Sequence, residues 1–144
     1  MKASEIDHIC FAVKNLDDAM KVYKETLGLD PDGVYTAPTE KIRVARYYLG
    51  TVALELMEPT EADSDVGRFI EKKGEGFFLI SYRVPDVAAG LEELNAKGYR
   101  TIDKAPRKLM GNRYAFGPAP KVMGGILTEI LDGDFDKSYE NPSE

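Results

Sequence analysis

The chain has 144 residues, 43% of them hydrophobic, and a formal net charge of −6. This length supports one hydrophobic core and is short for two ordinary domains, so we expect a single domain over residues 1–134. The acidic balance and the absence of a Lys/Arg block argue against a nucleic-acid surface. One cysteine excludes an intramolecular disulfide, the polar first residues are unlike a signal peptide, and no apolar run reaches about 18 residues. We therefore expect a cytoplasmic protein with a small-molecule partner, no nucleic acid and no membrane.

The first half of the chain predicts a strand, a helix and further strands. The strand spans Ile6 to Val13. Asn15 can cap the helix that follows, and Gly28 can end it, because glycine adopts the left-handed conformation at least cost. Strand-like sequence follows from Ile42 to Leu49 and from Leu54 to Glu58. The spacing of the helix predicts one apolar face, formed by Leu16, Ala19, Met20, Tyr23 and Leu27.

The second half of the chain repeats this pattern. Phe77 to Val84 matches Ile6 to Val13 at a shift of 71 positions. Asp86 can cap a second helix that ends at Gly98. Thr128 to Asp132 then matches Leu54 to Glu58 at a shift of 74. Three further features complete the pattern: a helix face of Val87, Leu91 and Leu94, a strand at roughly Arg113 to Phe116, and a connecting helix that Ser64 can cap and that ends at Gly74.

The repeat predicts the architecture, because each half is one copy of a β-α-β-β-β unit. Module one covers about 4–60, a linker helix about 62–73, and module two about 75–133, followed by a tail at 135–144. Neither module has enough surface to bury alone. We therefore expect an α+β fold in which the two modules form one curved, cupped mixed sheet with helices outside.

Each half has one glutamate within apolar strand sequence, Glu55 in the first half and Glu129 in the second. An ionised carboxylate buried there is costly unless it meets a cation, a metal or several donors. The repeat relates Glu55 to Glu129 and His8 to Leu79, so these positions should converge about a pseudo-twofold axis. Three of the four can bind a divalent metal. The alternative is a protonated His8 paired with the carboxylates in a metal-free cavity, and we expect Cys10 to be a small core residue.

Four segments carry a family resemblance through their order and spacing. They are Ile6-Asp7-His8-Ile9, Glu55-Leu56-Met57-Glu58-Pro59, Gly74-Glu75-Gly76 before an aromatic-rich strand, and Gly124-Gly125-Ile126-Leu127-Thr128-Glu129. Together they resemble the vicinal oxygen chelate (glyoxalase/bleomycin resistance/dioxygenase) superfamily, and methylmalonyl-CoA epimerases in particular, from about Ile6 to Leu131. The resemblance implies a glyoxalase-like fold and a divalent metal, cobalt, manganese, zinc or nickel, at His8, Glu55 and Glu129.

Two positions depart from the family pattern. The family typically has a histidine ligand at the place of Leu79 and often a second histidine at Phe78, and leucine cannot coordinate a metal. These replacements make the expected pocket more apolar, so Phe78 and Leu79 are candidate substrate contacts. The family base aligns with Thr39, and we expect Glu40 next to it to act instead.

The resemblance implies an epimerase-like isomerase. A metal would chelate the oxygens of a 2-substituted malonyl-CoA and stabilise its enolate. The two bases would be Glu129, in a double role as ligand and base, and Glu40. Lys121, Arg107 and Arg113 could meet an acidic substrate or the CoA phosphates, although a solvated loop is the alternative. Members of the superfamily often dimerise, so we expect a homodimer.

Two other functions remain open from the sequence. One is a metal-free small-molecule binding protein of the same superfamily, in which His8, Glu55 and Glu129 contact the ligand. The other is a different glyoxalase-type lyase or a dioxygenase. Dioxygenases of this group usually use two histidines and one glutamate, and the single histidine of this chain counts against them.

Overall fold

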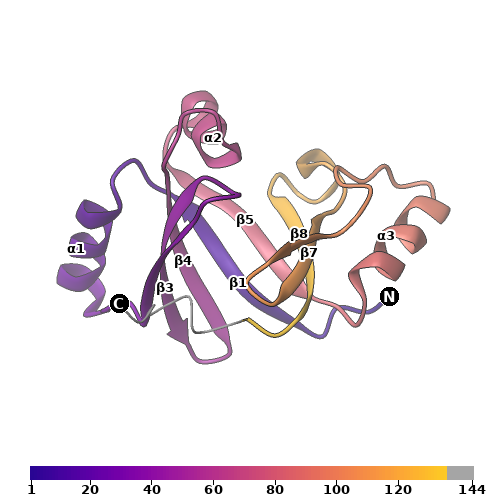
Figure 1. The fold of residues 1–144 in the computed structure, drawn as a ribbon, viewed down its shortest axis with the longest axis horizontal. Helices are drawn as coiled ribbons and strands as arrows, with labels where there is room; N and C mark the ends of the chain where they lie inside the picture. Colours follow the sequence, from indigo (N-terminus) through magenta and orange to yellow (C-terminus); the bar gives the residue numbers. More distant parts are fainter. Residues whose placement is uncertain (136–144) are drawn as a thin grey trace. The chain divides into compact units, whose positions relative to one another are not determined.

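The computed structural model describes residues 1–135. Beyond Phe135, the predicted tail lies outside the described residues. The strands occur in the order β2-β3-β4-β1-β5-β8-β7-β6 in one mixed sheet, accompanied by three α-helices (Figure 1). The elements are β1 (Glu5–Ala12), α1 (Leu16–Leu27), β2 (Gly33–Ala37), β3 (Ile42–Leu49), β4 (Val52–Pro59), α2 (Asp65–Lys73), β5 (Gly76–Arg83), α3 (Val87–Ala96), β6 (Arg107–Leu109), β7 (Asn112–Phe116), the 3-10 helix η1 (Pro120–Val122) and β8 (Leu127–Gly133).

Two compact units make up the described chain, and each is presented by itself. Within the described residues, the first comprises Ile9–Phe78, and the second comprises Met1–His8 together with residues 79–135. The division passes through β1 and β5, so each of these strands contributes residues to both units. Among the described helices, none is long and apolar enough to cross a membrane.

In the unit Ile9–Phe78, β2, β3 and β4 form an antiparallel meander on which α1 packs. The predicted caps of α1 are confirmed: Asn15 accepts a hydrogen bond from the backbone N–H of Asp18, and Gly28 has a φ of 69°. The predicted apolar face is confirmed except at its end, because Leu27 is 64% exposed in the last turn. The helix residues that pack on the core are Leu16, Ala19, Met20 and Tyr23.

In the unit from Leu79 onward, β8 pairs in parallel with β5 and antiparallel with β7, and α3 packs on β7 and β8. Asp86 caps α3 as predicted, since its side chain accepts a hydrogen bond from the N–H of Ala89. The core under this helix combines Val84, Val87, Leu91, Ala115 and Ile130. The edge strands β2 and β6 are the elements that the sequence did not locate.

Equivalent hydrogen bonds recur in the two units at the shifts found in the sequence. The N–H of Val13 donates to the carbonyl of Met57 at 2.9 Å, and the N–H of Val84 donates to the carbonyl of Leu131 at 2.9 Å. A carboxylate from the closing strand also accepts from the first N–H of each helix. Glu58 accepts from Leu16 at 2.7 Å, and Asp132 accepts from Val87 at 2.7 Å. The repeat is thus built into backbone and capping contacts as well as into strand order.

Candidate functional site

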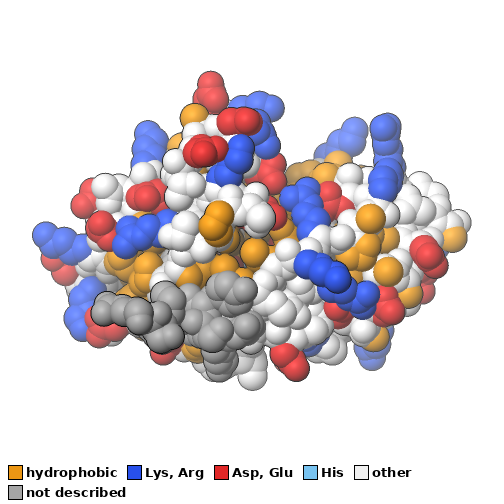
Figure 2. Space-filling view, in the orientation of Figure 1, with side chains coloured by type: hydrophobic (Ala, Val, Ile, Leu, Met, Phe, Trp, Pro, Cys, Tyr) orange, Lys and Arg blue, Asp and Glu red, His pale blue; other side chains and the backbone are white. Residues whose placement is uncertain are grey.

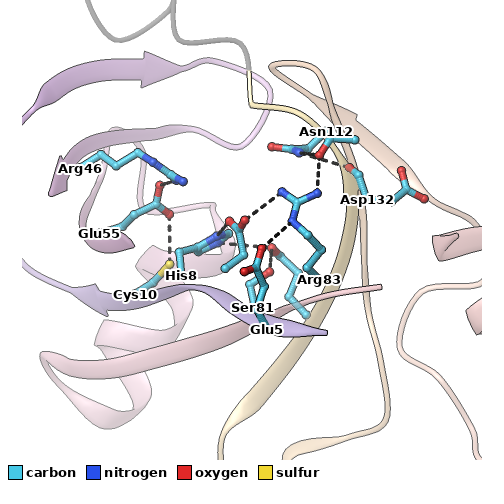
Figure 3. A network of polar contacts seen from close by, with 12 residues as sticks. Glu5, His8, Cys10, Arg46, Glu55, Ser81, Arg83, Asn112 and Asp132 are labelled. Carbon is cyan, nitrogen blue, oxygen red and sulfur yellow. Dashed lines mark hydrogen bonds and ion pairs between the residues drawn. The ribbon is translucent and has the colours of Figure 1, made fainter. Parts of the chain in front are cut away.

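Glu55 lies at the centre of a buried polar cluster in the unit Ile9–Phe78. Its Oε2 accepts hydrogen bonds from Arg46 Nη1 at 2.6 Å and from the hydroxyl of Tyr35 at 3.0 Å. Its Oε1 accepts a hydrogen bond from the thiol of Cys10 at 3.3 Å. Figure 3 shows Arg46 and Cys10 reaching the two oxygens of this carboxylate. Glu55 thus has the partners that a buried carboxylate requires.

The strand register produces this cluster. Arg46 on β3 is the direct cross-strand neighbour of Glu55 on β4, so both side chains leave the sheet on one face. The neighbouring residues Leu54 and Leu56 lie on the opposite face and pack in the core with Leu16 of α1. Glu55 and Arg46 are only 2% and 5% exposed, so their ion pair is shielded from solvent.

Arg46 and Tyr35 both stay protonated beside Glu55. Burial by itself would lower the pKa of Arg46, but the charge of Glu55 raises it well above its ordinary value. Burial and then the charge of Glu55 raise the pKa of Tyr35 well above its ordinary value. Arg46 therefore faces Glu55 as a cation, and Tyr35 faces it as a neutral hydroxyl.

His8 belongs to a second polar network, in the unit that contains β8. Its Nδ1 lies 2.8 Å from Oδ2 of Asp7, and Oδ1 of Asp7 accepts from Arg83 Nη2 at 3.0 Å. Its Nε2 lies 3.4 Å from Oε1 of Glu129. The hydroxyl of Ser81 donates to that same oxygen at 2.7 Å. Figure 3 shows His8, Ser81 and Arg83 in this network.

The Asp7 contact calls for a proton on Nδ1 of His8. A carboxylate only accepts hydrogen bonds, so Nδ1 carries a proton and Nε2 faces Glu129. An imidazole lone pair facing a carboxylate oxygen needs a cation between them, either a proton or a metal. Metal-binding histidines commonly donate their second ring N–H to a carboxylate in this way.

The geometry of His8 and Glu129 fits a divalent metal. Two ligands of a tetrahedral zinc ion, each at about 2.0–2.2 Å, are separated by roughly 3.4 Å. The observed separation of Nε2 and Oε1 is 3.4 Å. In the unit Ile9–Phe78, the carboxylate of Glu55 is likewise oriented by hydrogen bonds, as ligating carboxylates usually are. Imidazole and carboxylate groups suit a divalent metal by their chemistry, and the predicted ligand set His8, Glu55 and Glu129 stays a prediction.

The two glutamates occupy equivalent positions with different neighbours. Cys10 and Ser81 are repeat-related and each donates to the glutamate of its own unit. The cross-strand neighbour differs, because Glu55 faces Arg46 whereas Glu129 faces Phe116. Arg46 therefore faces Glu55 as a charged neighbour, whereas the strand neighbour of Glu129 is uncharged.

The other predicted site residues occupy varied surroundings. Glu40 is half-buried in the turn between β2 and β3, and Lys121 is exposed on η1. Arg113 binds Asp132 through two hydrogen bonds, of 3.0 and 2.8 Å. Phe78 packs edge-on against Phe69 of α2, with ring centroids 5.1 Å apart. Leu79 is buried beside Leu127 in the parallel pair of β5 and β8, and the proposed role of these residues in substrate binding stays a prediction.

Sequence reasoning missed the residues that support the predicted ligands: Asp7, Tyr35, Arg46 and Ser81. Asp7 directly precedes His8 on one strand, and strand alternation turns adjacent side chains to opposite faces, so the sequence gives no sign of this contact. The repeat itself carried the signal for Ser81, because Ser81 matches Cys10 at the shift of 71. Arg46 could have been noticed as a charged residue in the otherwise apolar run Val44 to Leu49.

A family model and similar proteins match this chain over most of its length. The model of the Glyoxalase/Bleomycin resistance protein/Dioxygenase superfamily matches residues 7–116. The uncharacterized protein YqjC of Bacillus subtilis is 34% identical over 139 residues, which cover 96% of this chain and 99% of that protein. The mitochondrial methylmalonyl-CoA epimerase of Mus musculus is 29% identical over 131 residues, which cover 90% of this chain and 73% of the mouse protein.

Solved structures share the fold. A Streptomyces coelicolor methylmalonyl-CoA epimerase variant in complex with 2-nitronate-propionyl-CoA matches with a TM-score of 0.82 and 33% identity, covering 90% of this chain and 97% of that one. A hypothetical protein, BH1468 from Bacillus halodurans, matches with a TM-score of 0.83 and 28% identity, covering 90% and 94% of the two chains. The predicted glyoxalase-like fold class, two β-α-β-β-β modules in a mixed sheet, is confirmed.

Proposed function

Because the chain belongs to the Glyoxalase/Bleomycin resistance protein/Dioxygenase superfamily, we propose that it is an isomerase of the methylmalonyl-CoA epimerase type. It would move the proton on the carbon between the thioester and the carboxylate of a 2-substituted malonyl-CoA. The observation that carries the proposal is the 3.4 Å approach of His8 Nε2 and Glu129 Oε1. Asp7 and Ser81 support this pair with hydrogen bonds.

The metal ligands of the proposal are His8, Glu55 and Glu129. A divalent cobalt, manganese, zinc or nickel ion bound there would supply Lewis-acid stabilisation of the enolate. Asp7 keeps the proton on Nδ1 of His8, so the lone pair of Nε2 would be available to bind the metal. Tyr35 and Arg46 hold the carboxylate of Glu55 in one orientation.

Proton transfer would use two carboxylates of this chain. Glu129 removes the proton from one face of the carbon, and the Ser81 hydroxyl steadies its carboxylate. Glu40, in the turn between β2 and β3, returns a proton to the other face. Inversion of configuration requires one proton-transfer group on each face of the carbon. The proposal therefore needs Glu40 as well as Glu129.

Cations of the second half would bind the acidic part of the substrate. Lys and Arg side chains lie over β7 and β8 in the view of Figure 2. Lys121 is exposed on η1, and Arg107 stacks on Phe116 with 4.9 Å between its guanidinium carbon and the ring centroid. Arg113 is already engaged by Asp132 and Arg107 by Asp103, so Lys121 is the stronger candidate for CoA phosphates. The predicted homodimer and the predicted cytoplasmic location also stay predictions.

Proton exchange on methylmalonyl-CoA in D2O, followed by NMR, tests the proposal. Wild-type protein loaded with cobalt or manganese should exchange the α-proton, and Glu129→Gln should lower the rate by at least about 100-fold. Glu92→Gln on the exposed side of α3 is the matched control and should retain the wild-type rate. Absence of exchange in the loaded wild type, with no response to Glu129→Gln, would reject the epimerase.

A metal-free binding protein of the same superfamily is the second candidate. The observations that favour it are the neutralisation of Glu55 by Arg46 and the buried Leu79 at the fourth ligand position. Elemental analysis after purification without chelator or affinity tag separates the two functions. Near-stoichiometric metal that is lost in His8→Ala supports the enzyme, and no metal under any loading supports the binding protein.

A further inference from the structure

We infer that Arg46 sets the effective charge of Glu55 and thereby limits how tightly this protein binds a divalent cation. The inference rests on the proposed metal site and assigns a specificity-determining role to a residue outside the proposed ligand set. Arg46 acts through Glu55, so it is a positioning and charge-setting residue rather than a ligand.

The first observation is the permanence of the ion pair. Arg46 Nη1 lies 2.6 Å from Glu55 Oε2, and both side chains are almost completely buried. Guanidinium does not lose its proton in proteins, so the positive charge stays at every physiological pH. The positive charge of Arg46 offsets the negative charge of Glu55, so this carboxylate attracts a divalent cation less strongly than an unpaired carboxylate would.

The second observation is the asymmetry between the two halves. Glu129 has the aromatic Phe116 as its cross-strand neighbour, whereas Glu55 has Arg46. The proposed ligand set therefore combines one charged carboxylate, one neutralised carboxylate and one imidazole. The charge count of the ligands is a main determinant of cation affinity in oxygen-rich sites. An arginine beside Glu55 lowers that count by one.

The third observation is that Glu55 keeps other anchors when Arg46 is removed. The hydroxyl of Tyr35 donates to Oε2 at 3.0 Å, and the thiol of Cys10 donates to Oε1 at 3.3 Å. Arg46→Met removes the positive charge and preserves most of the side-chain length. The variant therefore removes the positive charge opposite Glu55 while two hydrogen bonds of its carboxylate persist.

Calorimetric titration of metal-stripped protein with Co2+ tests the inference. Arg46→Met should bind Co2+ at least about tenfold more tightly than wild type. Arg46→Lys keeps the charge and is the matched control, so its affinity should stay near that of wild type. In the double variant Arg46→Met/Glu55→Gln the added charge is removed again, and the affinity should return toward the wild-type value.

Circular dichroism and thermal unfolding identify any variant that fails to fold. Arg46→Gln replaces Arg46→Met if that variant is unfolded, with the same expected tightening. Unchanged or weaker Co2+ binding by a folded neutral variant overturns the inference, and so does equal tightening by Arg46→Lys. The proton-exchange assay reports on the proposed function separately. Tighter binding in Arg46→Met without any exchange in wild type supports the charge effect and rejects the epimerase.

Discussion

Replacing Asp132 by alanine tests how the closing strand of the second half holds its helix. Asp132 Oδ2 accepts a hydrogen bond from the backbone N–H of Val87, the first residue of α3, at 2.7 Å. It also binds Arg113 through 3.0 and 2.8 Å contacts. The substitution leaves a buried N–H without its acceptor and removes a negative charge from a helix N-terminus.

The expected loss can be estimated from these contacts. An unsatisfied buried N–H costs about 1–3 kcal/mol, and the helix-end charge adds about 0.3–1 kcal/mol. The ion pair contributes little more, since the side chain of Arg113 is 42% exposed. We expect Asp132→Ala to lower the free energy of unfolding by about 2–4 kcal/mol and Arg113→Ala to lower it by less than about 1 kcal/mol.

Urea denaturation of both variants measures the difference. Equal losses in Asp132→Ala and Arg113→Ala would refute the reasoning, because the ion pair rather than the helix contact would then dominate. Burial alone raises the pKa of Asp132, but the hydrogen bonds from Arg113 and Val87 outweigh it and leave the pKa below its ordinary value. This stabilisation is present above the unfolded pKa of about 3.9 and is lost as the pH falls through the folded pKa. The gap between wild type and Asp132→Ala should therefore narrow below about pH 4.

Two further predictions concern the unit Ile9–Phe78. Glu58→Ala removes the repeat-related contact with the N–H of Leu16 and should cost about 1–3 kcal/mol in urea denaturation; a loss near zero would show that the two caps are not equivalent. Tyr47 is 1% exposed, and its hydroxyl has no hydrogen-bond partner among the described residues. Tyr47→Phe should therefore raise the free energy of unfolding by about 1 kcal/mol, seen as a higher melting temperature, and a lower one would reveal a bond that the hydroxyl makes.

Local patterns in the sequence predicted the helices well. The caps Asn15, Ser64 and Asp86 bond the N–H groups three residues later, as their residue types favour. The one residue of the predicted α1 face that stays exposed is Leu27, in the last turn of the helix. The edge strands β2 and β6 escaped prediction because they are short and lack a strong alternating pattern.

The ligand chemistry was also visible in the sequence. The internal repeat related Glu55 to Glu129 and singled out His8, and the structure brings His8 and Glu129 within 3.4 Å. The expectation that something must neutralise a carboxylate buried in an apolar strand was correct for Glu55. The sequence indicated a metal or a protonated His8 as the partner, whereas Arg46 pairs with Glu55 in the structure.

The partner of Glu55 was decided by tertiary structure. Arg46 faces Glu55 only because β3 and β4 pair in one register, and a slip of one residue would turn either side chain to the opposite face. The contact of Asp7 with His8 likewise depends on side-chain orientation at neighbouring positions of one strand. The sequence by itself determined the repeat and the helix caps and indicated the types of the proposed ligands, because these depend on local spacing and residue chemistry. Only the tertiary structure decided which cation pairs with Glu55, because that depends on which strands pair and in what register.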